Sequence, residues 1–253
     1  MELTKLAGAC VLSLFFFGSV SGQTVKCDTI HDFSDHGCSQ AIYKAPNGKH
    51  YKVKFVDAPM EDALPEFESN TATNCADSLF AGTARKAAKT SIVTAQTEDF
   101  ATVSAFIKTL ATDAVMRTKV NSNSKRVSLE NRNVHFSKDT YIFAFKKESD
   151  DDYHVIIGDN KDPKKATFFN TEISGLPNTT DKRFISVRDQ FEHQFVNVCS
   201  GQYAVFSANP IKISMEGSIF FDVDHKPGQI GPPGFQPLTT WEIHPITKIA
   251  FLK

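Results

Sequence analysis

The sequence has no surplus of charge of either sign, and this absence argues against whole classes of partner. Its 28 Lys and Arg are balanced by 29 Asp and Glu, which leaves a formal net charge of −1. Residues 119–253 are balanced as well, with 17 Lys and Arg against 16 Asp and Glu. A near-neutral chain has no electrostatic reason to bind nucleic acid or an anionic membrane. We therefore expect a protein or glycan partner rather than nucleic acid.

Several catalytic signatures are also missing. The sequence contains no Gly-x-Ser-x-Gly elbow, no phosphate-binding glycine-rich loop before a helix, no dinucleotide-binding fingerprint and no zincin motif. Its glycine-rich segment, residues 228–234, contains prolines and precedes a predicted strand, so it does not match a phosphate-binding loop. No internal repeat and no low-complexity segment is present. Any enzymatic site must therefore be sought in scattered residues.

Long hydrophobic runs are scarce, and the clearest one lies near the N-terminus. Leu6–Phe17 follows Lys5 and precedes small residues at positions 18–22. The run is too short for a membrane span, which needs about 20 apolar residues. A positive residue, a short apolar run and small residues are typical of a secretory signal peptide. We predict a signal peptide at residues 1–22, no transmembrane span, and a secreted or periplasmic protein.

Cysteine is sparse, with one of the five residues inside the predicted signal peptide. The other four are Cys27, Cys38, Cys75 and Cys199. An even number in an oxidising compartment suggests disulfides, and four cysteines allow three pairings. We predict that the two closest in sequence pair with each other, which leaves Cys75 with Cys199. Metal binding is less favoured because no Cys-x-x-Cys spacing is present.

From residue 23 to residue 120 we predict an N-terminal α+β region. The extended runs 41–43 and 51–56 flank an Asn-Gly pair, which is a strong hairpin signal. A helix is predicted at 76–88. Apolar residues at helical spacing predict a second helix at 97–114, with Thr97 as its N-cap. The residues that carry this spacing are Phe100, Val103, Phe106, Ile107, Leu110 and Ala114.

A polar linker at 121–125 marks the predicted boundary to a C-terminal domain, residues 121–253. Strands are predicted at 141–145, 153–157, 166–173, 211–223 and 240–251, with a helix at 184–195 that begins near Asp181. Three strands, a helix and two strands is the element order of a five-stranded OB-type barrel. We therefore predict an α+β protein: a hairpin-plus-helices region followed by an OB-like β-barrel. The loops at 149–152 and 224–239 would flank its ligand face.

Three short polar-aromatic stretches in this domain contain the candidate site. They are Asp151-Asp152-Tyr153-His154, Phe220-Phe221-Asp222-Val223-Asp224-His225 and Trp241-Glu242-Ile243-His244-Pro245. Because side chains alternate along a strand, Asp152 and His154 share one face, as do Glu242 and His244. Each stretch thus presents a carboxylate and an imidazole next to the predicted ligand face.

These stretches resemble a group of uncharacterised exported bacterial proteins. In that group the similar pattern reads Gly-Asp-Tyr-His, then Gly-x-x-Phe-Phe-Asp-x-x-His, then Glu-Leu-His-Pro. The present chain keeps Gly217 and the residues after it in the second stretch, and the resemblance covers about Val134–Lys253. It implies an exported, β-rich domain and implies no reaction. One departure is Asp151, which stands where the group usually has glycine and so bears on the turn.

Imidazole and carboxylate groups are typical ligands of zinc and other divalent ions. The candidate metal ligands are His154, Asp222, His225 and His244, and the candidate catalytic residues are His154, His244 and Glu242. A bound divalent metal would activate water for hydrolysis of a phosphodiester or an ester. Without metal, a histidine oriented by a carboxylate would act as general base.

Two other interpretations stay open. Histidine–carboxylate pairs also anchor loops, and Asp150–Asp152 is then a solvated hairpin turn. Alternatively, Tyr153, Phe235 and Trp241 stack on a ligand, although a place in the core suits them better. We predict an exported binding or accessory protein of the cell envelope or extracellular space, with a metal-assisted hydrolase as the alternative.

Overall fold

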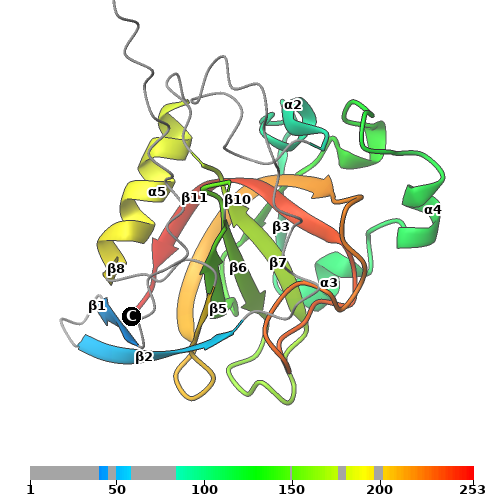
Figure 1. Cartoon of the computed structure of the whole chain (residues 1–253). Helices are drawn as coiled ribbons and strands as arrows, with labels where there is room; N and C mark the ends of the chain where they lie inside the picture. The colour runs from blue at the N-terminus through cyan, green and yellow to red at the C-terminus, as the bar shows by residue number, and fades with distance from the viewer. Residues whose placement is uncertain (1–39, 45–49, 58–83, 149, 176–180, 197–201) are drawn as a thin grey trace, which may run out of the picture.

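Five strands close on one another at the centre of the computed structural model (Figure 1). The structure describes residues 40–44, 50–57, 84–148, 150–175, 181–196 and 202–253. The barrel strands are β5 (Tyr141–Lys147), β6 (Tyr153–Gly158), β7 (Phe168–Ile173), β10 (Ile211–Phe221) and β11 (Trp241–Phe251). All five were predicted, although β10 ends at Phe221 and leaves Asp222 and Val223 in the following loop.

The pairing of these strands is that of an OB-type barrel. Around the barrel the order is β5, β6, β7, β11, β10, and a contact between Ile211 and Ile142 closes β10 onto β5. β7 and β11 run parallel, and the other barrel pairs are antiparallel. The helix α5 (Lys182–Gln194) connects the third strand to the fourth. The predicted α+β fold with an OB-like barrel is therefore confirmed.

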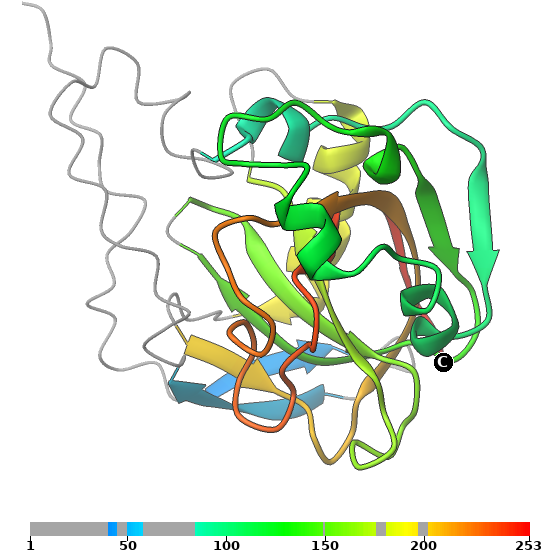
Figure 2. The ribbon, with the colours of Figure 1, turned by 90° about the vertical axis from the view of Figure 1, so that its right-hand side faces the viewer.

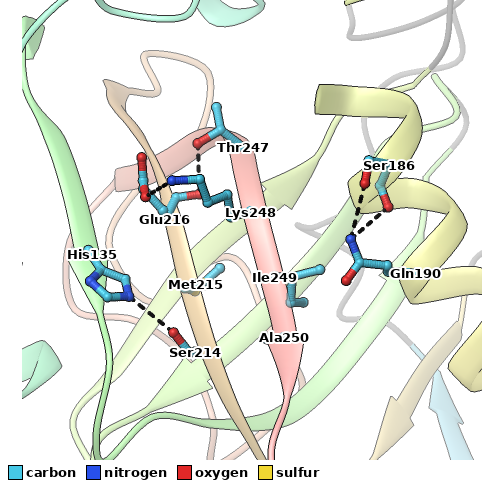
Figure 3. A pocket seen from close by; sticks show the side chains of 10 residues that line it. All are labelled: His135, Ser186, Gln190, Ser214, Met215, Glu216, Thr247, Lys248, Ile249 and Ala250. Atoms are coloured by element: carbon cyan, nitrogen blue, oxygen red, sulfur yellow. Dashed lines mark hydrogen bonds and ion pairs between the residues drawn. The ribbon is translucent and has the colours of Figure 1, made fainter. Parts of the chain in front are cut away.

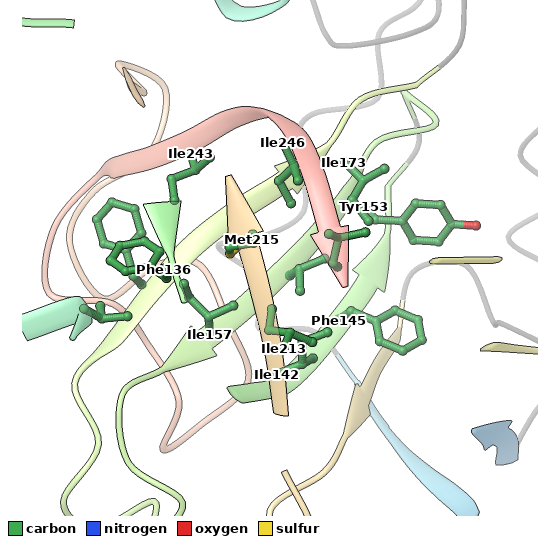
Figure 4. Close-up of a cluster of buried hydrophobic side chains, with 14 of the residues drawn as sticks. Phe136, Ile142, Phe145, Tyr153, Ile157, Ile173, Ile213, Met215, Ile243 and Ile246 are labelled. Atoms are coloured by element: carbon green, nitrogen blue, oxygen red, sulfur yellow. The ribbon is translucent and has the colours of Figure 1, made fainter. Parts of the chain in front are cut away.

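The barrel interior is filled by apolar side chains from alternate strand positions (Figure 4). On β10, Ile211, Ile213 and Met215 are buried while the residues between them are partly exposed. This alternation is what a strand with one face toward a core requires. One end of the core is aromatic, where the Phe145 ring lies 5.0 Å from the ring of Phe191 on α5.

The helix α5 begins where the sequence predicts. The Asp181 side chain accepts a hydrogen bond of 2.8 Å from the backbone N–H of Arg183, as an N-cap residue does. Its apolar face, which includes Phe184, Val187 and Phe191, is buried. The helix packs beside β11 (Figure 1). None of the helices in the described ranges is long and apolar enough to cross a membrane.

The helix predicted at 97–114 is wrong. These residues form the strand β3 (Thr97–Phe100), the short helix α3 (Val103–Ile107) and the start of α4 (Asp113–Arg117). Each helix has its own threonine N-cap, because the hydroxyls of Thr102 and Thr112 accept hydrogen bonds from the first turns. Residues 97–100 pair instead in parallel with β4 (Asn133–Phe136), a strand that was not predicted.

Further strands extend the sheet on both sides of the barrel (Figure 2). The strands of the predicted hairpin are present as β1 (Gln40–Lys44) and β2 (His50–Asp57), which pair with each other. A strand that was not predicted, β9 (Gln202–Val205), lies between β2 and the barrel strand β5 and pairs with both. A short strand, β8 (Phe195–Val196), pairs with β1. Residues before and after position 121 thus contribute to the same sheet, and the boundary there stays a prediction.

Some predicted features lie outside the described residues. They are the signal peptide, the four candidate disulfide cysteines (Cys27, Cys38, Cys75 and Cys199) and the turn at 45–49. Of the helix predicted at 76–88, only residues 84–88 are described, and the helix there is the single turn α2 (Lys86–Lys89). A 3-10 turn, η2 (Ser128–Glu130), leads into β4.

Candidate functional site

The outer face of the barrel carries buried polar side chains. On β6, Tyr153 and Val155 belong to the core, whereas His154 between them lies on the opposite face. The same alternation on β7 and β11 adds four buried polar residues to this face: Asn170, Glu172, Glu242 and His244. In OB-type barrels this is the surface that, together with the two flanking loops, binds ligands.

The strand β7 joins the residues of the two predicted stretches. It lies between β6 and β11, and its register sets Glu172 opposite His154 and Asn170 opposite Glu242. His154 and His244 therefore converge on one residue of the strand between them, Glu172, which was not among the predicted site residues. Its signal was present, because in the segment Phe169–Ile173 the strongly polar Asn170 and Glu172 alternate with phenylalanine, threonine and isoleucine.

Three side chains offer ligand atoms that all lie within 4.8 Å of one another: Asp152, Glu172 and His244. We call them the candidate metal group. The Nε2 atom of His244 is 3.4 Å from Asp152 Oδ2 and 3.7 Å from Glu172 Oε2. All three residues are buried. Of the four predicted metal ligands, only His244 belongs to this group.

The ammonium group of Lys89 lies against the same two carboxylates. Its Nζ atom is 3.1 Å from Asp152 Oδ2 and 2.8 Å from Glu172 Oε2. Burial alone would lower the pKa of Lys89, but the charges of Glu172 and Asp152 outweigh it and raise this pKa well above its ordinary value. Burial would raise the pKa of each carboxyl, yet the charge of Lys89 holds both below their ordinary values. The site therefore contains an ammonium ion between two carboxylates.

Two arginines fix the segment that carries Lys89. Arg126 donates 2.7 Å and 3.0 Å hydrogen bonds to the carbonyl oxygens of Ala88 and Ser91, on either side of Lys89. Arg85 binds both carboxylate oxygens of Glu130, at 2.8 Å and 2.6 Å. Because these guanidinium groups are largely buried and have several partners each, they hold α2 against the barrel. The sequence gives no signal that this segment meets β7 and β11.

The ring orientation of His244 follows from its partners. Its Nδ1 atom lies 2.7 Å from the backbone oxygen of Lys89, which can only accept a hydrogen bond, so Nδ1 carries the proton. Nε2 then faces the two carboxylates and the hydroxyl of Ser174, which is 3.2 Å away. A backbone carbonyl bound to the distal N–H is the usual arrangement behind a metal-binding histidine.

His154 is held between two carboxylates. Its Nδ1 atom is 3.1 Å from Glu148 Oε1, and its Nε2 atom is 2.8 Å from Glu172 Oε1. With an acceptor beside each nitrogen, the ring is best satisfied as an imidazolium with two N–H donors. The ammonium of Lys146 is 3.0 Å from the same Glu148 oxygen. His154 thus acts as a cation within the cluster and lies beside the candidate metal group, not in it.

Asp222 and His225 form a second pair next to this cluster. His225 Nδ1 is hydrogen-bonded to Asp222 Oδ2, and the backbone N–H of Asp224 donates to Asp222 Oδ1 at 2.8 Å. Burial disfavours the charged imidazole, but the hydrogen bond to Asp222 prevails and raises the pKa of His225. The His225 ring lies 6.0 Å from the His154 ring, and its Nε2 atom is buried without a hydrogen-bond partner among the described residues.

Two buried oxygens at the site have neither a hydrogen bond nor an ion pair in the described part of the chain. The Asn170 amide donates to Glu172 Oε1 at 3.1 Å and to Glu242 Oε2 at 3.0 Å. Glu242 Oε1 and Asn170 Oδ1 remain buried and unpaired. Burial, followed by the charges of Glu172 and Asp222, raises the pKa of Glu242 well above its ordinary value. Glu242 therefore holds a proton more readily than an exposed glutamate does.

The turn between β5 and β6 is not the solvated turn that we considered. Asp150 and Asp152 are both buried, and burial followed by the charge of Asp152 raises the pKa of Asp150 to about 7. Asp151 has a φ of 67°, in the left-handed region that glycine adopts most readily. Its carboxylate is 2.8 Å from Arg188 and 3.0 Å from Lys147. These ion pairs hold a non-glycine residue in a glycine-like conformation.

The other predicted residues lie in the core. Tyr153 and Trp241 are buried, and Phe235 packs against Phe143 and Phe168. Fold and site together define an OB-type barrel whose ligand face contains a buried cluster of histidines, carboxylates and lysines. No protein-family model, curated protein or solved structure matches the chain.

Proposed function

We propose that the protein is an exported binding protein whose OB barrel holds a divalent cation at Asp152, Glu172 and His244. The separations of 3.4 and 3.7 Å between His244 Nε2 and the two carboxylate oxygens carry this proposal. A tetrahedral ion about 2.0–2.2 Å from each ligand keeps its ligands roughly 3.3–3.6 Å apart. The three groups are therefore spaced as ligands of one ion.

The surroundings of the group also support a cation. His244 presents Nε2 to the carboxylates because its Nδ1–H is bound to the Lys89 carbonyl. Six acidic side chains lie at the site, Glu148, Asp150, Asp152, Glu172, Asp222 and Glu242, against three cationic ones, Lys89, Lys146 and His154. Buried carboxylates need cations or protons to offset their charge. A divalent ion would supply that charge.

Lys89 and the divalent ion would compete for the same oxygens. The Lys89 side chain is 15% exposed, whereas the carboxylates are 0% and 1% exposed, so part of the lysine side chain reaches solvent while the carboxylates do not. Its stem has four rotatable methylene groups and can carry the ammonium outward when an ion enters. Binding would thus exchange an internal cation for an external one.

The proposal also includes export of the protein and a protein or glycan partner outside the cytoplasm. Export rests on the signal peptide predicted at residues 1–22 and on the resemblance to exported proteins. A protein or glycan partner in that compartment agrees with the balanced charge of the chain. The cation would then order the ligand face and its flanking loops.

The test is the metal content of the purified protein, combined with thermal unfolding in the presence of Zn²⁺ or Mn²⁺. We expect near-stoichiometric metal and a higher Tm for the wild type. Both effects should be lost in Glu172→Gln, which keeps the shape of the side chain, and in His244→Ala. His193→Ala on the exposed face of α5 is the matched control and should behave as the wild type. Absence of metal together with an unchanged Tm would overturn the proposal.

A metal-assisted hydrolase is the second candidate, and the Asp222–His225 pair favours it. A histidine oriented by a carboxylate, with its second nitrogen unpaired, is the arrangement of a general base. A metal at the neighbouring group would activate water for attack on a phosphodiester. The hydrolysis of bis-p-nitrophenyl phosphate by the metal-loaded protein tests this candidate. His225→Ala should abolish the activity and retain the metal.

A further inference from the structure

Away from the barrel face, three neighbouring strands place a serine, a histidine and an aspartate in a row. His135 on β4 lies beside Asp99 of β3 in the parallel register, and β10 on its other side carries Ser214. His135 Nδ1 is 2.6 Å from Asp99 Oδ1, and His135 Nε2 is 3.1 Å from Ser214 Oγ (Figure 3). One imidazole thus joins a hydroxyl to a carboxylate.

A serine hydroxyl, an imidazole and a carboxylate joined in this order form the arrangement that activates a serine for nucleophilic attack. The carboxylate can only accept, so Nδ1 of His135 carries the proton and Nε2 keeps a lone pair for the Ser214 hydroxyl. A hydroxyl bound to such a base, with the base oriented by a third group, is the common arrangement of nucleophilic serines on unrelated folds. The two hydrogen bonds come from three different strands, so the sheet itself sets their geometry.

A cavity of about 310 Å³ adjoins the serine. His135 and Ser214 lie on one side of it, and Ser186 and Gln190 of α5 lie on the other (Figure 3). The ammonium of Lys248 and the amide of Gln190 are N–H donors that line it. Its volume is at the lower end of small-molecule sites, which suits a small acyl group.

We propose that Ser214 is a nucleophile that attacks small carboxylic esters. The Ser214 oxygen would bond to the carbonyl carbon while His135 Nε2 takes the hydroxyl proton. The bond to the alcohol oxygen then breaks, and the alcohol leaves with that proton. Water, deprotonated by His135, hydrolyses the acyl-serine, and the serine regains a proton as the acid leaves. The Lys248 ammonium donates one hydrogen bond to Glu216 Oε2 at 2.7 Å and has further N–H groups for the carbonyl oxygen during the attack, whereas the Gln190 amide donates to Ser186.

Asp99 is a positioning residue in this reaction. Its side chain is 78% exposed and that of His135 is 29% exposed, so water competes for their hydrogen bond. The aspartate therefore contributes less here than a buried one does. The reaction uses no residue of the barrel-face cluster, so it stands or fails independently of the cation site.

A fluorophosphonate probe tests the proposal on the full chain. The reagent phosphonylates activated serines, and peptide mass analysis identifies the labelled residue. We expect labelling at Ser214, loss of the label in Ser214→Ala, and at least a hundredfold slower labelling in His135→Gln. Ser207→Ala is the control, because Ser207 is an exposed serine that does not line the cavity, and the labelling rate of this variant should be that of the wild type.

Asp99→Asn should slow labelling about tenfold, and Asp99→Glu should restore most of the rate, which a purely structural role would not produce. Circular dichroism confirms that each variant is folded. The proposal is overturned if the folded wild type takes up no label, if another serine is labelled, or if His135→Gln is labelled at the rate of the wild type. Hydrolysis of p-nitrophenyl acetate should follow the same order among the variants.

Discussion

Replacing Lys89 with methionine tests the charge balance of the barrel face. The substitution keeps a long, flexible apolar stem and removes the ammonium from between Asp152 and Glu172. Removing one partner of a buried ion pair costs about 3–5 kcal/mol, because the remaining charges lose their compensation. A domain of this size loses roughly 2–4 °C in Tm for each kcal/mol, so we expect Tm to fall by roughly 6–20 °C.

A divalent cation should reverse this loss. Without the ammonium, Asp152, Glu172 and His244 are free to bind the ion without competition. Binding to the folded state alone adds about 2.7 kcal/mol to the free energy of unfolding when the free ion is at a hundred times its Kd. Addition of Zn²⁺ should therefore raise Tm more in Lys89→Met than in the wild type.

The assay is thermal and urea unfolding of both proteins in chelator and in Zn²⁺. Lys161→Met, at an exposed loop lysine, is the control for loss of one positive charge and should unfold as the wild type does. A Tm for Lys89→Met within about 2 °C of the wild type in chelator would refute the buried ion pair. A large loss of stability with no recovery in Zn²⁺ would refute the cation site and leave the ion pair intact.

Two further predictions concern neighbouring residues. In chelator, the raised pKa of Asp150 means that the folded state keeps its proton while the unfolded chain releases it, so its contribution to stability is lost from about pH 4 to about pH 7. Asp150→Asn should therefore match the wild type at pH 4 and be the more stable protein in urea unfolding at pH 8. In Gly217→Ala, the new methyl group would lie 2.3 Å from Ile243 Cγ2 and 2.5 Å from the Pro245 carbonyl oxygen. Because a backbone oxygen cannot move aside without shifting β11, we expect a loss of at least 1–3 kcal/mol by urea unfolding, and an unchanged midpoint would contradict this close approach.

The barrel could be predicted because its signals are local. β10 begins with an apolar repeat of two residues, β5 and β6 contain short apolar runs, and the helix after β7 begins at an aspartate cap. The failure at residues 97–114 has a specific cause. Phe100 and Phe106 do share the core, with rings 5.2 Å apart, but they reach it from a strand and from a separate helix. Helical spacing cannot distinguish one element from two that meet at the same place.

Part of the site was predictable, because the faces of its strands also follow from a local pattern. His154, Glu242 and His244 lie on strands whose faces follow from alternation, and the alternation in β7 would also have identified Glu172. Lys89 could not be found in this way. Its place depends on where α2 lies against β7 and β11, and no local pattern near residue 89 encodes that contact.

The contact between Lys89 and the barrel also determines when the site can form. The His244 ring and the Lys89 carbonyl that it binds are 155 residues apart in sequence. During synthesis the chain emerges N-terminus first, so Lys89 is made long before the strand that carries His244. The acidic face is complete only after β11 has joined both β7 and β10. Before β11 has joined the sheet, His244 and Glu242 are missing from this face, so the candidate metal group is complete only when the last strand is in place.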